Sequence, residues 1–171
     1  KRWIKHLLCI WAVLVALAMV LPGCIGSVKA AEQADEAGDN VYWSFQEETG
    51  VLTIYGTGEI YDYSGFMGYY PPWEEFDGQI KQIVVEEGIT AIGSEAFCHC
   101  FNATCVTLPS TLETIEAGAF LYCESLQTIT IPENATNIGG GMVSSVFGGC
   151  ISMEKILVSE ENPAYTSVNG I

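Results

Sequence analysis

One stretch of this chain, Ile83-x-Val85 … Ile89-x-x-Ile92-Gly93-x-x-Ala96-Phe97-x-x-Cys100, returns twice in nearly the same form. The second copy reads Val106-x-Leu108-Pro109 … Leu112-x-x-Ile115-x-x-x-Ala119-Phe120-x-x-Cys123, and the third reads Ile129-x-Ile131-Pro132 … Ala135-x-x-Ile138-Gly139. The first residues of the copies, Ile83, Val106 and Ile129, are 23 residues apart each time. A fixed period of this length is typical of a solenoid, in which one small unit is stacked on copies of itself.

Each unit begins with two apolar residues at alternate positions, which predicts a short, half-buried strand. Pro109 and Pro132 follow two of these strands, and proline ends a strand because it has no N–H group to donate. A second apolar pair, such as Ile89 and Ile92, suits either a tight turn or another short extended piece. The Ala-Phe pair then gives one small and one large core residue per coil. We therefore predict a β-rich fold with a parallel sheet whose strands centre on Ile83–Val85, Val106–Leu108, Ile129–Ile131 and Ile156–Val158.

The fourth unit is in register only after an insertion. Phe147 follows Phe120 by 27 residues, so four extra residues lie within the Gly- and Ser-rich segment 139–145. This composition predicts a surface loop. A tolerated change of length explains it more simply than a binding loop, because lengthening a surface loop costs little.

The Ile-Gly-x-x-Ala-Phe-x-x-Cys pattern and the Ile-x-Ile-Pro strand ends resemble the BspA-like leucine-rich repeats of bacterial surface and secreted proteins. The resemblance covers residues 80–171, and the segment 41–79 looks like the β-hairpin cap that precedes such repeats. It departs from the pattern at Ala135, at the insertion, and at Glu116, which stands where a glycine follows the isoleucine in the other units. The resemblance implies a right-handed leucine-rich-repeat solenoid of about four coils, the last one truncated at Ile171. It also implies binding or adhesion at a cell surface without catalysis.

Residues 1–30 have the features of a secretory signal peptide. Lys1, Arg2 and Lys5 precede an uncharged apolar run that is short for a membrane-spanning helix. Cleavage before Ala31 is favoured by the small residues around Ala30, whereas Leu-Pro-Gly-Cys24 resembles a lipoprotein box that would make Cys24 a lipidated N-terminus. Residues 31–40 are acidic and aperiodic, which predicts a flexible linker.

After residue 30 the chain keeps all 21 carboxylates and only two lysines, Lys81 and Lys155, for a net charge of −19. This charge argues against a nucleic-acid partner, and against contact with anionic lipid unless Cys24 carries a lipid anchor. It favours a monomer kept soluble by self-repulsion. A basic partner or divalent cations remain the alternative, although no calcium-binding loop motif is present.

Cys100, Cys123 and Cys150 occupy one repeat position, so we expect them to form a buried row of thiols inside the solenoid. Cys98-His99-Cys100 also has the residue types of a metal cluster or a Cys-His nucleophile. The repeat register favours the buried thiol row over a metal cluster or a nucleophile, because His99 is equivalent to Tyr122 and Gly149, a position without chemical preference. We therefore predict no metal site, no cofactor and no catalytic residue.

The segment from Tyr61 to Phe76 contains seven aromatic residues. Two interpretations are open: a platform that binds carbohydrate or peptide, or a cap over the open end of the solenoid. The cap is favoured, because a stable repeat array needs a capping unit.

The sequence predicts a non-enzymatic, secreted or surface-displayed module that binds a protein or another cell-surface ligand. The alternative is a non-catalytic targeting arm of a larger secreted hydrolase. Solenoids bind partners on the exposed face of their sheet, so the candidate binding residues are those that alternate with the buried strand residues. They form two rows, one of Gln82, Cys105, Thr128 and Lys155, and one of Val84, Thr107, Thr130 and Leu157.

Overall fold

The structure, a computed structural model, describes residues 36–139 and 146–168. The signal-peptide segment, Cys24 and residues 140–145 of the segment that contains the insertion lie outside these ranges. The described elements are β1 (Glu36–Gly38), β2 (Val41–Gln46), β3 (Val51–Gly56), β4 (Gly58–Glu59), the short 3-10 helices η1 (Gly65–Met67) and η2 (Glu74–Phe76), β5 (Gln82–Val85), β6 (Ile89–Ile92), β7 (Cys105–Thr107), β8 (Thr114–Ile115), β9 (Thr128–Ile131), β10 (Asn137–Ile138) and β11 (Lys155–Val158). Within this part of the chain, no helix is long and apolar enough to cross a bilayer.

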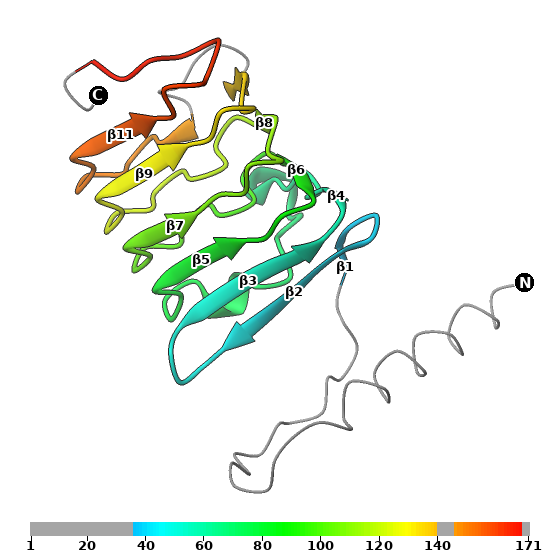
Figure 1. Ribbon diagram of the computed structural model, residues 1–171. Helices are drawn as coiled ribbons and strands as arrows, with labels where there is room; N and C mark the ends of the chain where they lie inside the picture. The colour runs from blue at the N-terminus through cyan, green and yellow to red at the C-terminus, as the bar shows by residue number, and fades with distance from the viewer. Residues whose placement is uncertain (1–35, 140–145, 169–171) are drawn as a thin grey trace, which may run out of the picture. The chain divides into compact units, whose positions relative to one another are not determined.

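The strands form two sheets that run along the stack (Figure 1). The larger sheet has the order β1-β2-β3-β5-β7-β9-β11, and the smaller has the order β10-β8-β6-β4. In the larger sheet Gln82 pairs with Cys105, Cys105 with Thr128, and Thr128 with Lys155. These pairs reproduce the 23-residue step twice and then the 27-residue step, so the predicted solenoid and its register are confirmed. The second apolar pair reaches the smaller sheet in three units. Ile89 and Ile92 both lie in β6, whereas Ile115 and Ile138 alone represent the later pairs in β8 and β10.

The cap, which was predicted over residues 41–79, lies at the N-terminal end of the stack and contains a β-hairpin. β2 and β3 make an antiparallel hairpin, and β3 then pairs in parallel with β5, the first repeat strand. The prediction of a flexible linker as far as Asn40 is wrong in its last residues, because β1 pairs with β2 and buries Ala37. A segment with few apolar residues is ordered here by backbone hydrogen bonds, including the one that Tyr61 N–H donates to the Ala37 carbonyl.

Stacked aromatic rings form the centre of the core. The ring centroids of Phe97 and Phe120 lie 5.4 Å apart, and those of Phe120 and Phe147 lie 5.7 Å apart, so the three phenylalanines form one column. Trp73 adds a further ring from the cap, with its centroid 5.6 Å from that of Phe97. Its indole N–H donates a 3.0 Å hydrogen bond to the carbonyl of Ala96. The column therefore runs without a break from the repeats into the cap.

The last described segment folds back onto the third coil through one buried polar residue, Asn162. Its side-chain amide donates to the carbonyls of Pro132 and Ala135, and its Oδ1 accepts from the N–H groups of Ala164 and Tyr165. All the polar atoms of this side chain are thereby satisfied, as burial requires.

Candidate binding surfaces

The two predicted rows lie on the outward face of the larger sheet. Strand pairing places Gln82, Cys105, Thr128 and Lys155 side by side, and Val84 lies beside Thr107. Leu157 pairs with Thr130 and is 39% exposed. The residues between them, such as Ile83 and Ile129, are buried, so the alternation predicted from the sequence sets which side chains reach solvent.

The cap extends this outward face beyond the rows that the repeat predicts. Val51 and Thr53 of β3 pair with Gln82 and Val84, and Ser44 and Gln46 of β2 pair with Thr53 and Val51. The two rows therefore begin in the hairpin and cross six strands in one register. The alternation Val51-x-Thr53-x-Tyr55 was the available signal, but it lies outside the 23-residue period.

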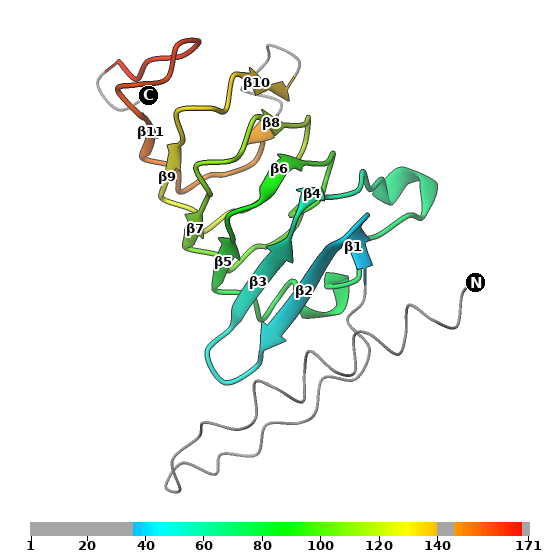
Figure 2. The same cartoon turned by 45° about the vertical axis from the view of Figure 1, so that its right-hand side comes forward.

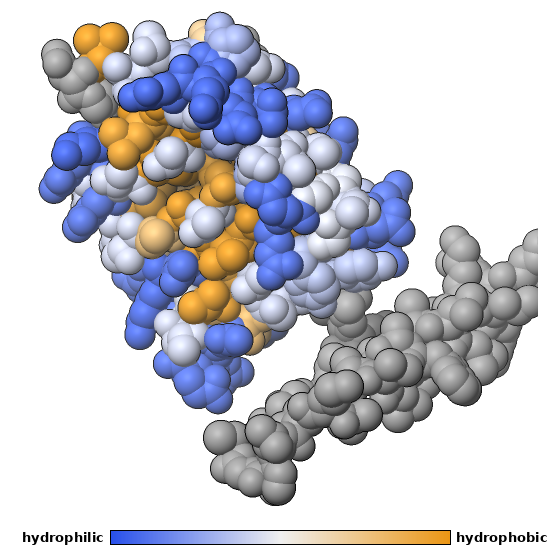
Figure 3. Space-filling model, viewed as in Figure 1, coloured by the Kyte–Doolittle hydropathy of each residue, from blue (hydrophilic) through white to orange (hydrophobic). Residues whose placement is uncertain are grey.

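The outward face differs in character from its surroundings. In Figure 3 an apolar band runs along the stack across the strands of the larger sheet, and hydrophilic residues border it on both sides. Among the outward residues of β2, β3, β5, β7, β9 and β11, Lys155 is the one charged side chain. The nearest carboxylate in the same sheet is that of Glu36, which lies in the edge strand β1 and pairs with Tyr42.

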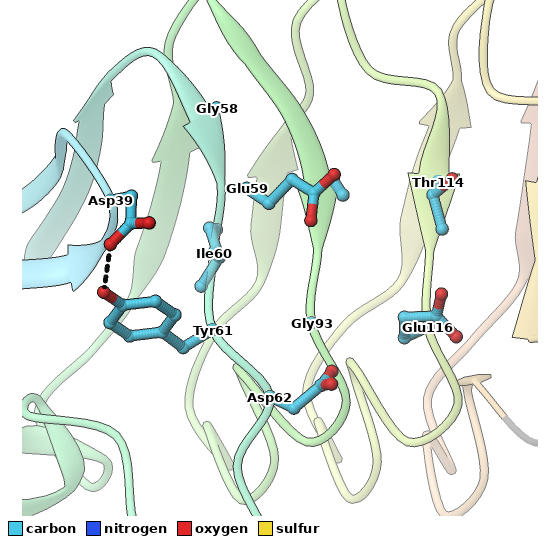
Figure 4. Close-up of a pocket in the computed structure, with 10 residues that line it drawn as sticks. Asp39, Gly58, Glu59, Ile60, Tyr61, Asp62, Gly93, Thr114 and Glu116 are labelled. Carbon is cyan, nitrogen blue, oxygen red and sulfur yellow. Dashed lines mark hydrogen bonds between the residues drawn. The ribbon is translucent and has the colours of Figure 1, made fainter.

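A trough of about 490 Å³ lies on the smaller sheet (Figure 4). Asp39, Glu59, Tyr61 and Asp62 line one side of it, and Thr114 and Glu116 line the other. Pairing across β4, β6 and β8 places Glu59, Ala91 and Thr114 in three successive coils. The repeat pattern does not predict this trough, although Glu116 is one of the positions that depart from the repeat.

The trough is hollow because the middle coil has almost no side chains there. Ala91 and Gly93 form its floor. A Cβ atom on Gly93 would collide with the carbonyl group of Tyr61, so the coils approach too closely at this point for any larger residue. Glu116 occupies the next equivalent position, and its carboxylate forms a wall.

Hydrogen bonds fix Asp39 and Asp62, which lie on the side of the trough opposite Glu116. The Tyr61 hydroxyl donates a 2.8 Å hydrogen bond to Oδ1 of Asp39, and this bond, together with the negative charge nearby, raises the pKa of Tyr61 above its ordinary value. Oδ1 of Asp62 accepts a 2.7 Å hydrogen bond from the N–H of Ser94. Within residues 36–139 and 146–168, no three His, Cys, Asp or Glu side chains are placed to hold a metal ion.

The aromatic segment Tyr61–Phe76 contains buried residues, as expected for a cap, and exposed residues, as expected for a binding platform. Tyr63 and Trp73 are buried and Phe76 packs against the core, so these residues form the cap. Phe66, Met67 and Tyr70 are exposed, and so is Tyr69, although its ring stacks on the buried ring of Tyr63. One continuous sequence segment thus supplies both a cap and an exposed apolar loop.

The conformation of the backbone distinguishes the repeat position that His99 occupies. His99, Tyr122 and Gly149 all have positive φ angles, 67°, 59° and 75°, so this repeat position is a left-handed turn. The rings of His99 and Tyr122 stack in parallel, with centroids 5.2 Å apart. Burial raises the pKa of the Cys98 thiol to about 11, although its Sγ lies 3.4 Å from Nδ1 of His99. A neutral thiol is a poor nucleophile and a poor metal ligand.

The row of cysteines lies beside the phenylalanine column. The Cys123 and Cys150 thiols donate to the carbonyls of Phe97 and Phe120, each one coil earlier. Burial raises the pKa of Cys100 well above its ordinary value, and the pKa of Cys123 is raised by its contact with the Cys150 thiol and by burial. The five described cysteines are not bridged to one another.

Comparison with solved structures returns leucine-rich-repeat proteins. One from Eubacterium ventriosum is 26% identical with a TM-score of 0.50, and the match covers 79% of this chain and 46% of that one. The chain thus spans less than half the length of this relative. A leucine-rich-repeat protein from Bacteroides capillosus is 16% identical, with a TM-score of 0.49 and coverage of 75% of this chain and 99% of that one. A leucine-rich cell surface protein from Faecalibacterium prausnitzii is 15% identical, with a TM-score of 0.30 and coverage of 82% and 57%.

No curated protein matches the chain. The family model of the BspA-type leucine-rich-repeat region matches residues 75–167, with six copies of its repeat. The match covers more than half of the chain and coincides with the coils that carry the phenylalanine column. The chain belongs to the BspA-type leucine-rich-repeat family.

Proposed function

We propose that the chain is a non-catalytic module that binds another protein through the outward face of its larger sheet, and that it acts in adhesion outside the cell. One observation carries the proposal: two rows of neutral side chains cross six strands in register, with Lys155 as their one charge. Charged residues are depleted at the centre of protein interfaces, because a charge there must lose its water. In a chain with 21 carboxylates, a neutral face of this length is the surface that costs least to cover.

The test uses two variants of the full chain on an array of purified secreted and cell-surface proteins. Thr107→Arg with Thr130→Arg places two bulky charges in the middle of the face, where both side chains are exposed. Thr136→Arg is the matched control, because Thr136 is exposed but lies outside the larger sheet. We expect array partners of the wild type to be lost by the double variant and kept by the control. If every partner binds the double variant as well as the wild type, the face is not the binding surface.

Export is the second part of the proposal and rests on residues 1–30. Their positive start and apolar run support passage through a secretory route, and the charge of the rest supports a soluble extracellular module. Mass spectrometry of the chain expressed in a bacterial host is expected to find Ala31 at the N-terminus. A lipid-modified Cys24 would instead indicate anchoring, and an intact N-terminus in the cytoplasm would contradict export.

A further inference from the structure

A loop next to β4 exposes more apolar surface than the fold requires. Phe66 is 100% exposed and Met67 is 83% exposed, while Tyr69 and Tyr70 are about half exposed at 57% and 51%. In Figure 2 this teal loop, which contains η1, projects beyond β4. Contiguous exposed apolar residues are unusual on soluble proteins and indicate interaction sites.

The loop is held in one shape. Ser64 and Tyr69 exchange two backbone hydrogen bonds of 2.8 and 3.0 Å, and Gly68 closes the turn with a φ of 72°. The Gly65 N–H donates a 2.9 Å bond to Oε2 of Glu95 in the first coil. Phe66 is therefore presented on an ordered turn, which lowers the entropic cost of binding.

The loop lies beside the acidic trough. Tyr61 and Asp62 line the trough and lie four and three residues before Gly65, where the loop begins. The ring of Tyr63 stacks on that of Tyr69 with centroids 5.7 Å apart. Ser94, whose N–H donates to Asp62, is adjacent in the sequence to Glu95, whose carboxylate accepts the hydrogen bond from Gly65 of the loop. The exposed apolar residues and the carboxylates of Asp39, Glu59, Asp62 and Glu116 thus belong to one continuous surface.

Charge complementarity identifies the occupant. The carboxylates beside the loop attract Lys and Arg side chains, and the trough leaves room for them above Ala91 and Gly93. A second copy of this chain does not fit, because after residue 30 it offers only Lys81 and Lys155 against 21 carboxylates. An anionic bilayer is repelled by the same charges.

We propose that the loop Gly65–Tyr70 and the acidic trough form a second docking surface, which binds a cationic, amphipathic segment of a partner protein. Phe66 and Met67 contact the apolar side of that segment, and Glu59 and Glu116 pair with its Lys or Arg residues. This surface is separate from the outward face of the larger sheet and does not depend on the function proposed for that face.

The experiment selects random dodecapeptides displayed on phage against the full chain and measures the affinity of the selected peptides by fluorescence polarisation. The expected peptides carry Lys or Arg close to aromatic or aliphatic residues. Phe66→Ser with Met67→Ser, and separately Glu59→Gln with Glu116→Gln, are each expected to weaken binding by about tenfold or more. Raising the salt to about 0.5 M should weaken it further, because the charge contacts are exposed.

Matched controls change the same residue types elsewhere. Ile151→Ser removes another exposed apolar residue, and Glu124→Gln with Glu154→Gln removes two exposed carboxylates. These variants are expected to bind the selected peptides within about twofold of the wild type. The Thr107→Arg, Thr130→Arg variant is expected to do the same, because its substitutions lie on the outward face of the larger sheet and the array experiment tests that face separately. Selected peptides without basic residues, the absence of any selected peptide, or unchanged affinity of both test variants would overturn the proposal.

Two further measurements can overturn it independently. The melting temperature of the Phe66→Ser, Met67→Ser variant is expected to equal that of the wild type, because both side chains are exposed. A clear fall would make the loop a part of the cap instead. Flotation with phosphatidylcholine vesicles is expected to recover no protein, and recovery that depends on Phe66 would assign the loop to a membrane surface.

Discussion

The cap and the repeats build the same aromatic core in different ways. In the coils, Phe97, Phe120 and Phe147 stack nearly face to face, with interplanar angles of 20° and 8°. In the cap, Trp73 stacks on Phe97 at 23° but meets Tyr63 and Trp43 edge-on, at 71° and 69°. A ring that is covered on both faces by its equivalents continues the column, whereas rings turned edge-on close it. The column is thus built from two kinds of sequence: the phenylalanines come from the repeats, and Trp73 comes from the cap, which is not repeated.

The largest effect is expected from removing the ring of Trp73, which joins the cap to the column. Trp73→Ala is expected to cost about 4–5 kcal/mol of unfolding free energy, since it removes a fully buried indole and its hydrogen bond to Ala96. Trp73→Phe keeps a ring in the column and should recover more than half of that loss. Denaturant unfolding measures both variants, and a cost below about 1 kcal/mol for Trp73→Ala would show that the cap is not part of the stack.

A second comparison lies within the column. Phe120→Ala is expected to cost about 3–4 kcal/mol, because Phe120 is fully buried between Phe97 and Phe147. Phe147→Ala is expected to cost about half as much, since Phe147 is 9% exposed and stacks on one described ring. Denaturant unfolding measures both variants. Equal losses of unfolding free energy would mean that the number of stacked neighbours does not determine how much each phenylalanine stabilises the coils.

A third change tests how closely the cap approaches the first coil. Gly93→Ala is expected to cost about 2 kcal/mol, because its Cβ atom would collide with the Tyr61 carbonyl. Glu116→Gly, at the equivalent position of the next coil, restores the repeat and should change stability by less than about 1 kcal/mol. Thermal unfolding compares the two variants, and a harmless Gly93→Ala would contradict the close contact.

A fourth change concerns Asp77, which follows η2 where the cap joins the first coil. Burial, with a smaller contribution from the charge of Glu74, raises the pKa of Asp77 from 3.8 to about 7. The folded chain therefore holds a proton that the unfolded chain has lost, so stability falls as the pH rises from about 4 through 7.

Asp77→Asn removes this pH dependence. The variant is expected to be about 1–2 kcal/mol more stable than the wild type near pH 8, a value reduced for the partial exposure of the side chain, and about equal to it near pH 4. Denaturant unfolding across this pH range is the measurement. A variant that gains nothing at pH 8 would show that Asp77 is well solvated.

The smallest effect is expected from the thiol row, which lies beside the phenylalanine column. Titration of the unfolded chain should find at least three free thiols, and reductant should leave the stability of the folded chain unchanged. Finding one free thiol or none would mean that neighbouring coils are bridged.

The repeat itself was predictable because every coil repeats the same choice of buried residue. The period placed the four repeat strands of the larger sheet, their register and the eight outward residues, since side chains in a strand alternate between its two faces. It left open whether the second apolar pair of each unit forms a turn or a strand. Where the sequence is not repeated, prediction was weaker. Ala37 and Asp39 were assigned to a linker because few of their neighbours are apolar. In the structure Ala37 lies in β1, which pairs with β2, and Asp39 follows β1 and accepts a hydrogen bond from Tyr61.

The coil, its period, its buried side and the neutral rows on the opposite side can be read from the sequence, because local alternation and a fixed step are enough to define a stack. Which residues of the cap are buried and which face solvent depends on the folded chain, as the buried Trp73 and the exposed Phe66 show. Only the folded chain brings Asp39, Glu59 and Glu116 around a floor of Ala91 and Gly93. The physical reason is that such contacts join segments far apart in the chain, and no local pattern records which distant atoms come to lie beside one another.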